Sequence, residues 1–296
     1  MLDRKGLISF LFITFGLTYV VEIGMITAGL RFTQGVTGIF AQLVIMSVMW
    51  VPALATVITT RLVTREGLGN TGLRFPPLGV LVWTGLSVPL LFALIFGVTW
   101  LLGLGHPDWR MAEFQALYAN QGSTAELPLP AGAMLAVIFL GSTLVSPFLN
   151  SLVAFGEEWG WRGYLLPKLM PLGKPRAYVL SGVIWGLWHA PLVAVGFGYP
   201  GLSPWVGIPL FVLFTTALGM SINELSLRYR SSVLAAWLHG LFNSQRFGVW
   251  AVLFAGANPV FGGSFGLIGI LVWLGMALFI MRVWPAPPTA AAESHL

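Results

Sequence analysis

Three short motifs place ionisable side chains inside an otherwise apolar chain. They are Glu157-Glu158 followed by Arg162, then His189, then His239 followed by Asn243. Carboxylates and imidazoles can take a proton from water and so turn it into a nucleophile. Ionisable groups at membrane depth are costly, and by default they mark a functional site. We therefore expect these motifs to form a site that activates a water molecule.

The first motif predicts different roles for its two glutamates. Residues i and i+4 of a helix are neighbours whereas i and i+1 diverge, so Arg162 is expected to pair with Glu158. Glu157 is then left without a helical partner, and we expect it to be the reactive carboxylate and general base. Taken alone, the motif is equally consistent with a face of mixed charge at the end of a helix.

The histidine motifs supply partners for such a base. His189 lies in a charge-free run, and Pro191 is expected to loosen the helix beside it and free backbone carbonyls. His239 and Asn243 are four residues apart and share one helix face, and Gly240 allows another backbone to approach closely. Each of these side chains, taken singly, is also explained by hydrogen bonding between helices.

Two schemes for hydrolysis fit these side chains. In one, Glu157, His189 and His239 bind zinc or another divalent ion, which acts as a Lewis acid and makes its bound water more acidic. In the other, without a metal, Glu157 and His189 act as the base. His239 and Asn243 then donate hydrogen bonds to the developing oxyanion. The spacing leaves both schemes open.

Other polar features receive no catalytic role. Glu22, alone in the first apolar segment, is interpreted as an interhelical contact. The Gly-x-Ser-x-Gly pattern at 262–266 cannot form a strand-to-helix nucleophile elbow at the end of a membrane helix, so we interpret it as a glycine-rich loop. The His-Glu-x-x-His signature of soluble zinc proteases is absent. The chain also has no cysteine, which excludes a cysteine nucleophile and a thiolate metal site.

Composition places the chain in a lipid bilayer. Charged residues make up 8% of its 296 residues and the mean hydropathy is +0.85, whereas soluble domains carry about 25% charged residues. Two runs, 127–156 and 177–223, contain no Asp, Glu, Lys or Arg and exceed the roughly 20 apolar residues that span a bilayer. We therefore expect an all-α, polytopic membrane helix bundle. The net charge of +5 is small and dispersed, so it does not predict nucleic-acid binding.

The charges of the loops predict the topology. We expect about eight transmembrane helices, at residues 7–30, 37–60, 78–103, 131–155, 177–197, 204–224, 232–254 and 263–284. With the N-terminus in the cytoplasm, the cytoplasmic side holds Arg4, Lys5, Arg61, Arg65, Arg74, Arg162, Lys168, Lys174, Arg176, Arg228, Arg230 and Arg282. The outer side then holds only Arg31, Arg110 and Arg246. This asymmetry follows the positive-inside rule and puts both termini in the cytoplasm.

A single integral membrane domain, residues 1–296, is expected, with a catalytic core at 135–250. The longest connection, 104–130, is expected to contain an interfacial helix near 109–120. The tail 285–296 is rich in proline and alanine, and we expect it to be disordered.

In their order, the three motifs resemble those of the CPBP family of CAAX prenyl endopeptidases and bacteriocin-processing proteins, also called Abi. The resembling parts are Glu-Glu-x-x-x-Arg at 157–162, Trp-x-x-x-His at 185–189 and His-x-x-x-Asn at 239–243. The family usually has Phe at the position of Trp185, and an indole there would narrow the pocket. The resemblance is concentrated at residues 135–250.

This resemblance implies an eight-helix intramembrane endopeptidase whose cavity opens toward the cytoplasm. Glu157 would activate the water beside His189, with His239 and Asn243 as metal ligands or oxyanion donors. The substrate would be a CAAX-type or bacteriocin-leader peptide, or a lipidated protein, cut in the plasma membrane. Two other functions are open: a non-catalytic membrane adaptor and a proton-coupled transporter. The sequence does not predict the oligomeric state.

Overall fold

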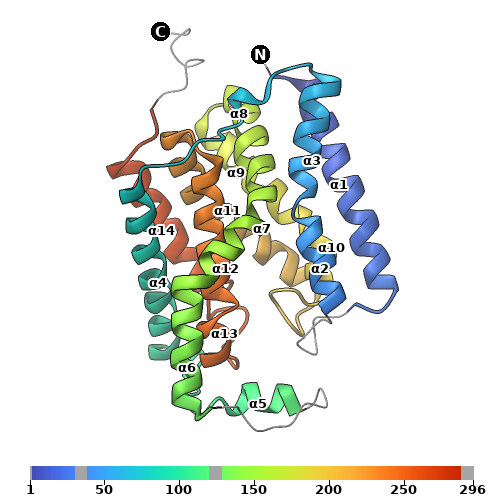
Figure 1. The fold of residues 1–296 in the computed structure, drawn as a ribbon. Helices are drawn as coiled ribbons and strands as arrows, with labels where there is room; N and C mark the ends of the chain where they lie inside the picture. Colours follow the sequence, from blue (N-terminus) through green and yellow to red (C-terminus); the bar gives the residue numbers. More distant parts are fainter. Residues whose placement is uncertain (1, 31–38, 120–128, 288–296) are drawn as a thin grey trace.

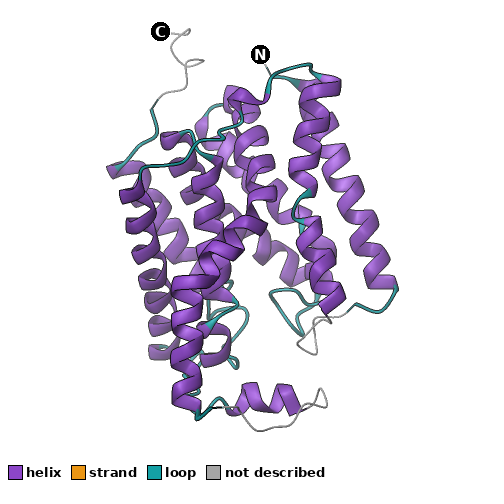
Figure 2. Ribbon diagram, viewed as in Figure 1, coloured by secondary structure: helices purple, strands orange, loops and turns teal. Residues whose placement is uncertain are grey.

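The computed structural model describes residues 2–30, 39–119 and 129–287, and these residues form helices joined by loops, with no strand among them (Figure 2). The predicted all-α class is therefore confirmed for this part of the chain. Most of the predicted tail, residues 288–296, lies outside the described residues, as does the predicted start of the second apolar segment.

The helices pack together as a bundle (Figure 1). They are α1 (Arg4–Thr27), α2 (Ile39–Val48), α3 (Val51–Ile58), α4 (Leu78–Leu101), α5 (Ala112–Ala119), α6 (Ala131–Leu140), α7 (Ser146–Gly160), α8 (Leu166–Leu169), α9 (Lys174–Trp188), α10 (Ala190–Ala194), α11 (Pro204–Tyr229), α12 (Ser232–Arg246), α13 (Val249–Leu253) and α14 (Leu267–Val283). Three π-helical turns continue α3, α6 and α7: η1 (Thr59–Val63), η3 (Gly141–Val145) and η4 (Trp161–Leu165). Short 3₁₀ turns lie at η2 (Leu68–Asn70) and η5 (Met170–Leu172).

Five helical stretches are long and apolar enough to cross a membrane: Arg4–Thr27, Ala41–Val63, Leu78–Leu101, Ala131–Leu172 and Pro204–Tyr229. The chain is thus an integral membrane protein. Helices α9, α12 and α14 occupy the other predicted segments but are shorter. The number of crossings and their orientation stay predictions. Helix α5 lies within the predicted interfacial segment, at the foot of the bundle in Figure 1.

The two ends of the described chain lie at the same end of the bundle (Figure 1). Before α1, Asp3 caps the helix by accepting from the Gly6 N–H, and it also bonds Lys168 Nζ at 2.9 Å. The hydrogen bond from Lys168 holds the pKa of Asp3 below its usual value. After α14, the Pro285 carbonyl accepts from Arg228 at 2.7 Å. Charged side chains therefore tie both ends of the chain to the same layer of helix ends.

Glycine lets α7 approach its neighbours closely. A Cβ at Gly160 would lie 2.3 Å from Pro52 Cβ of α3, and a Cβ at Gly240 of α12 would lie 2.3 Å from Ser151 Oγ of α7. Backbones can come this close only where no side chain separates them. The predicted close approach at Gly240 is confirmed, and α7, which carries the glutamates, is held between α3 and α12.

The helix breaks where Pro191 predicts. Helix α9 ends at Trp188 and α10 begins at Ala190. Proline has no N–H to donate to the carbonyl of Leu187 four residues earlier, and the Tyr19 hydroxyl of α1 donates to that oxygen at 2.6 Å instead. The break therefore both turns the chain at His189 and fixes α1 against this segment.

The close packing at Gly160 predicts a stability effect. Gly160→Ala forces a methyl group into the α3 backbone, and overpacking of this kind costs about 1–3 kcal/mol. We expect a lower melting temperature in detergent, followed by tryptophan fluorescence. Gly275→Ala is the matched control, because a Cβ at Gly275 of α14 meets nothing within 4 Å. Equal melting temperatures for the two variants would contradict the close contact.

Candidate active site

The polar motifs meet at one cavity inside the bundle. Its volume is about 200 Å³, and Glu157, His189, His239 and Asn243 all line it. They come from α7, the break after α9, and α12. Residues more than 80 positions apart in the sequence are thus brought to a single space, and the break in the helix brings His189 to the same cavity as Glu157.

Glu158 lies behind this cavity as the centre of a buried charge network. Its carboxylate is fully buried and accepts from Arg162 Nη1 at 2.8 Å through each oxygen. The same carboxylate lies 2.8 Å from His239 Nδ1. The predicted Glu158–Arg162 ion pair is confirmed. The sequence did not predict that Glu158 would also orient His239, which is an interaction between α7 and α12.

Glu157 is held by two indoles. Its Oε2 accepts from Trp185 Nε1 at 2.7 Å and from Trp161 Nε1 at 3.2 Å, and the residue is 1% exposed. Trp161 is four residues further along the chain, so the prediction that Glu157 has no helical partner is wrong. The partner is a neutral donor and not a cation. The indoles fix one oxygen of the carboxylate while leaving it free of any ion pair with Lys or Arg among the described residues.

Both histidines have Nδ1 engaged. His189 Nδ1 lies 2.9 Å from the Trp185 carbonyl oxygen, which can only accept, so Nδ1 carries the proton. His239 Nδ1 donates to Glu158 for the same reason. These contacts leave each Nε2 without a partner within the described part of the chain. A hydrogen bond that fixes Nδ1 orients the ring and determines what Nε2 can do.

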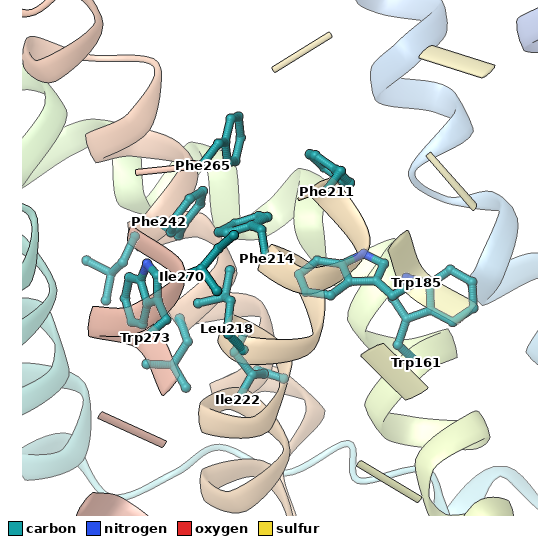
Figure 3. Close-up of a cluster of buried hydrophobic side chains, with 14 of the residues drawn as sticks. Trp161, Trp185, Phe211, Phe214, Leu218, Ile222, Phe242, Phe265, Ile270 and Trp273 are labelled. Carbon is teal, nitrogen blue, oxygen red and sulfur yellow. The ribbon is translucent and has the colours of Figure 1, made fainter. Parts of the chain in front are cut away.

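Aromatic rings enclose the polar groups. The phenylalanines that line the cavity include Phe211, Phe214, Phe242 and Phe265, which gather beside Trp185 (Figure 3). The Phe211 ring lies 4.9 Å from the His189 ring, and the Trp185 ring lies 5.3 Å from the His239 ring, centroid to centroid. Such a wall keeps the site apolar, which strengthens electrostatic interactions inside it.

Three site features were missed by sequence reasoning. Asn223 of α11 accepts a hydrogen bond from Arg162 Nε at 2.9 Å. The Arg162 guanidinium lies over the Trp185 ring, 4.5 Å from the ring centroid. Glu22 is 1% exposed and lines the cavity, yet neither of its oxygens has a hydrogen-bond partner in the described part of the chain. The predicted interhelical contact of Glu22 thus involves no hydrogen bond to its carboxyl oxygens in the described part of the chain, and its place in the cavity was not predicted. The sequence offered one signal for Asn223 and Glu22, which is that each is a polar residue within an apolar segment.

A metal centre is not preformed by these side chains. Across the described residues, no three His, Cys, Asp or Glu side chains are grouped so that they could hold one ion. The free Nε2 atoms are chemically suitable ligands. However, Glu157 is turned toward two indoles and Glu158 toward Arg162 and His239. The arrangement is thus a poor fit to a bound metal, and we assign no reaction step to one.

Comparison with known proteins finds similarity over the segment that contains these side chains. The family model of the type II CAAX prenyl endopeptidase Rce1-like proteins matches residues 139–245. A curated protein of Methanococcus maripaludis, CAAX prenyl protease 2, is 36% identical over 102 residues, which are 32% of this chain. This segment of the chain is therefore similar to CAAX prenyl endopeptidases. The match covers only 37% of the length of that relative.

All seven residues of the CPBP-like motifs lie inside the matched segment, whereas Glu22 lies outside it. Trp185 is the position at which this chain departs from the usual CPBP phenylalanine. The Trp185 indole donates a hydrogen bond to Glu157, whereas a phenylalanine ring at this position has no donor. The narrowing of the pocket stays a prediction, whereas the hydrogen bond from Trp185 to Glu157 is one that a phenylalanine lacks.

The buried ion pair predicts a large stability effect. Arg162→Ala leaves Glu158 buried with no cation beside it, and breaking a buried pair in this way costs about 3–5 kcal/mol. We expect a markedly lower melting temperature in detergent. Arg74→Ala, at an exposed arginine, is the control, and surface changes of this kind cost about 0.5 kcal/mol or less. If both variants melt together, Arg162 does not stabilise the bundle.

Proposed function

We propose that this protein is an intramembrane endopeptidase in which Glu157 activates water. The observation that carries the proposal is a buried carboxylate in an apolar cavity that it shares with two oriented histidines, with no ion pair to Lys or Arg in the described part of the chain. A carboxylate that is positioned beside a water molecule can act as its general base. The similarity of residues 139–245 to CAAX prenyl endopeptidases supports the same chemistry.

The hydrogen bonds suggest how the side chains divide the work. Glu157 takes a proton from water, and the Nε2 lone pair of His189 accepts a hydrogen bond that orients the water toward the peptide carbonyl. His239, once protonated on both nitrogens, is stabilised by Glu158 and donates from Nε2 to the oxyanion. The Asn243 amide provides a second donor. Arg162 is a positioning residue, because it acts through Glu158 and does not line the cavity.

Zinc or another divalent ion is the alternative source of an activated water. Its binding would require Glu157 to leave the indoles and join His189 and His239. Chelation followed by zinc add-back separates the two schemes. Activity lost on chelation and restored by zinc would favour the metal scheme, whereas activity indifferent to a chelator would favour water activated by glutamate alone.

The proposed substrate is a peptide segment that enters the membrane with an apolar or lipidated part. The aromatic wall of the cavity supports an apolar ligand. The relative from Methanococcus maripaludis is named a CAAX prenyl protease, so we propose a prenylated protein as the first substrate class, with bacteriocin-leader peptides as the second. The location would be the plasma membrane, as a multi-pass protein.

The decisive test is Glu157→Gln, which keeps the shape of the side chain but cannot act as a base. Loss of a general base costs about 10²- to 10⁴-fold in rate, and we expect a loss of that size with the melting temperature maintained. Purified protein would be assayed against fluorogenic CAAX-like and leader peptides. Glu113→Gln, at an exposed glutamate of α5 that does not line the cavity, is the matched control.

The outcomes discriminate between functions. His239→Ala and Asn243→Ala should also lower the rate, since each removes a donor to the oxyanion. A well-folded Glu157→Gln protein that cleaves as fast as wild type would refute the proposed role of Glu157. An adaptor would keep its partner binding in this variant, and a proton-coupled transporter would lose uptake.

We infer eight crossings with both termini in the cytoplasm, because the loop charges and the shared end of the two termini agree. The chain has no cysteine, so single cysteines can be labelled without removing others. In whole cells, an impermeant maleimide should label Arg110→Cys, and it should label Arg74→Cys only after permeabilisation. Both residues are exposed. The reverse pattern would invert the topology.

A further inference from the structure

Glu22 is a buried acid in the cavity with no assigned role. It lies in α1, is 1% exposed, and neither carboxyl oxygen has a hydrogen-bond partner in the part of the chain that the structure describes. None of the described ion pairs involves it. Burying an ionisable group without a partner is costly. A side chain kept there at this cost is therefore a candidate for a function.

Two contacts of α1 position Glu22 beside the site. Trp188 Nε1 donates to Thr18 Oγ1 at 2.8 Å, and Tyr19 donates to the Leu187 carbonyl at 2.6 Å. Thr18 and Glu22 are four residues apart and share one face of α1. That face is therefore held against the segment that ends at His189, and Glu22 lines the same cavity as His189.

The two carboxyl groups of the cavity have opposite surroundings. Two indole N–H groups donate to Glu157, and donors of this kind stabilise an ionised carboxylate. Glu22 has no donor among the described residues, and it lines the same cavity as Glu157, where two negative charges would repel each other. The other titratable groups that line the cavity are His189 and His239, whose protonated nitrogens face Trp185 and Glu158. Glu22 is thus the carboxyl group better suited to hold a proton.

We propose that Glu22 is the general acid that protonates the leaving amine. This inference rests on the proposed endopeptidase function and extends it to a residue outside the segment matched by the family. Two carboxyl groups in different surroundings divide acid and base roles in other hydrolases. Here Glu157 receives a proton and Glu22 supplies one.

The step balances without a further reactant. Glu157 takes one proton from water as the water oxygen bonds to the peptide carbon. When the tetrahedral intermediate collapses, the C–N bond breaks and its electron pair stays on nitrogen, which takes the proton of Glu22. The proton on Glu157 then passes through a water of the cavity to the Glu22 carboxylate. The products are a carboxylic acid and an amine, formed from one peptide bond and one water.

The test compares a peptide with its ester, because an amine leaves only when protonated whereas an alcohol depends far less on an acid. Glu22→Gln keeps the size of the side chain but carries no acidic proton. On a CAAX-like peptide amide that wild type cleaves, we expect kcat to fall about 100-fold with KM little changed. On the ester with the same sequence, we expect kcat close to that of wild type.

Two further variants make the result decisive. Glu22→Asp keeps a carboxylic acid and should recover part of the amide rate, which a purely structural role at this position would not require. Glu157→Gln should abolish cleavage of both substrates. The Glu22→Gln protein must first melt at the temperature of wild type, which shows that it is folded. If it then lowers the amide and ester rates equally, or lowers neither rate, the acid role of Glu22 is overturned. If hydrolysis is independent of Glu157, the proposed function itself fails.

Discussion

The site depends on the contacts that the Glu158 carboxylate makes with Arg162 and His239. This carboxylate is fully buried and binds Arg162 of its own helical segment and His239 of α12 at the same time. A carboxylate that pairs with one cation is a local feature, whereas this one also links α7 to α12, which carry the first and the third motif. Removing it would leave Arg162 without its carboxylate partner and the Nδ1 donor of His239 without an acceptor. Because unpaired buried charges cost several kcal/mol, the ion pair and the orientation of His239 are one structural unit.

Small residues and proline bring the supporting helices to this unit. Because Gly160 and Gly240 have no side chains, α3 and α12 pack so closely against α7 that a Cβ at either position would overlap atoms of the neighbouring helix. Pro191 ends the regular helix at the point where His189 must turn into the cavity, and the carbonyl it frees is bonded by α1. The same break thus places both His189 and the helix that carries Glu22. Local backbone chemistry, and not long-range charge, determines these two positions.

The indoles give this chain a feature of its own. Trp185 donates to Glu157, lies over the Arg162 guanidinium and offers its carbonyl to His189. One residue therefore contacts Glu157, the charge network and His189. A phenylalanine could occupy the same place and keep the carbonyl contact, but it could not hold an oxygen of Glu157. The Glu157 carboxylate is fixed by neutral donors, which orient it but do not neutralise its charge. Arg162, in contrast, neutralises the charge of Glu158.

The sequence by itself determined the class of the protein, the helical segments and the pairing of Glu158 with Arg162. Apolar composition requires a lipid environment, and residues four apart in a helix meet whatever the rest of the fold does. It also located the break at Pro191. Contacts between helices were decided only by the tertiary structure, because spacing along the chain does not say which faces meet. These are the bond from Glu158 to His239, the indoles on Glu157, and the place of Glu22 in the cavity. Glu22 shows the reason most clearly, since a lone acid has no local partner and its surroundings come entirely from other helices.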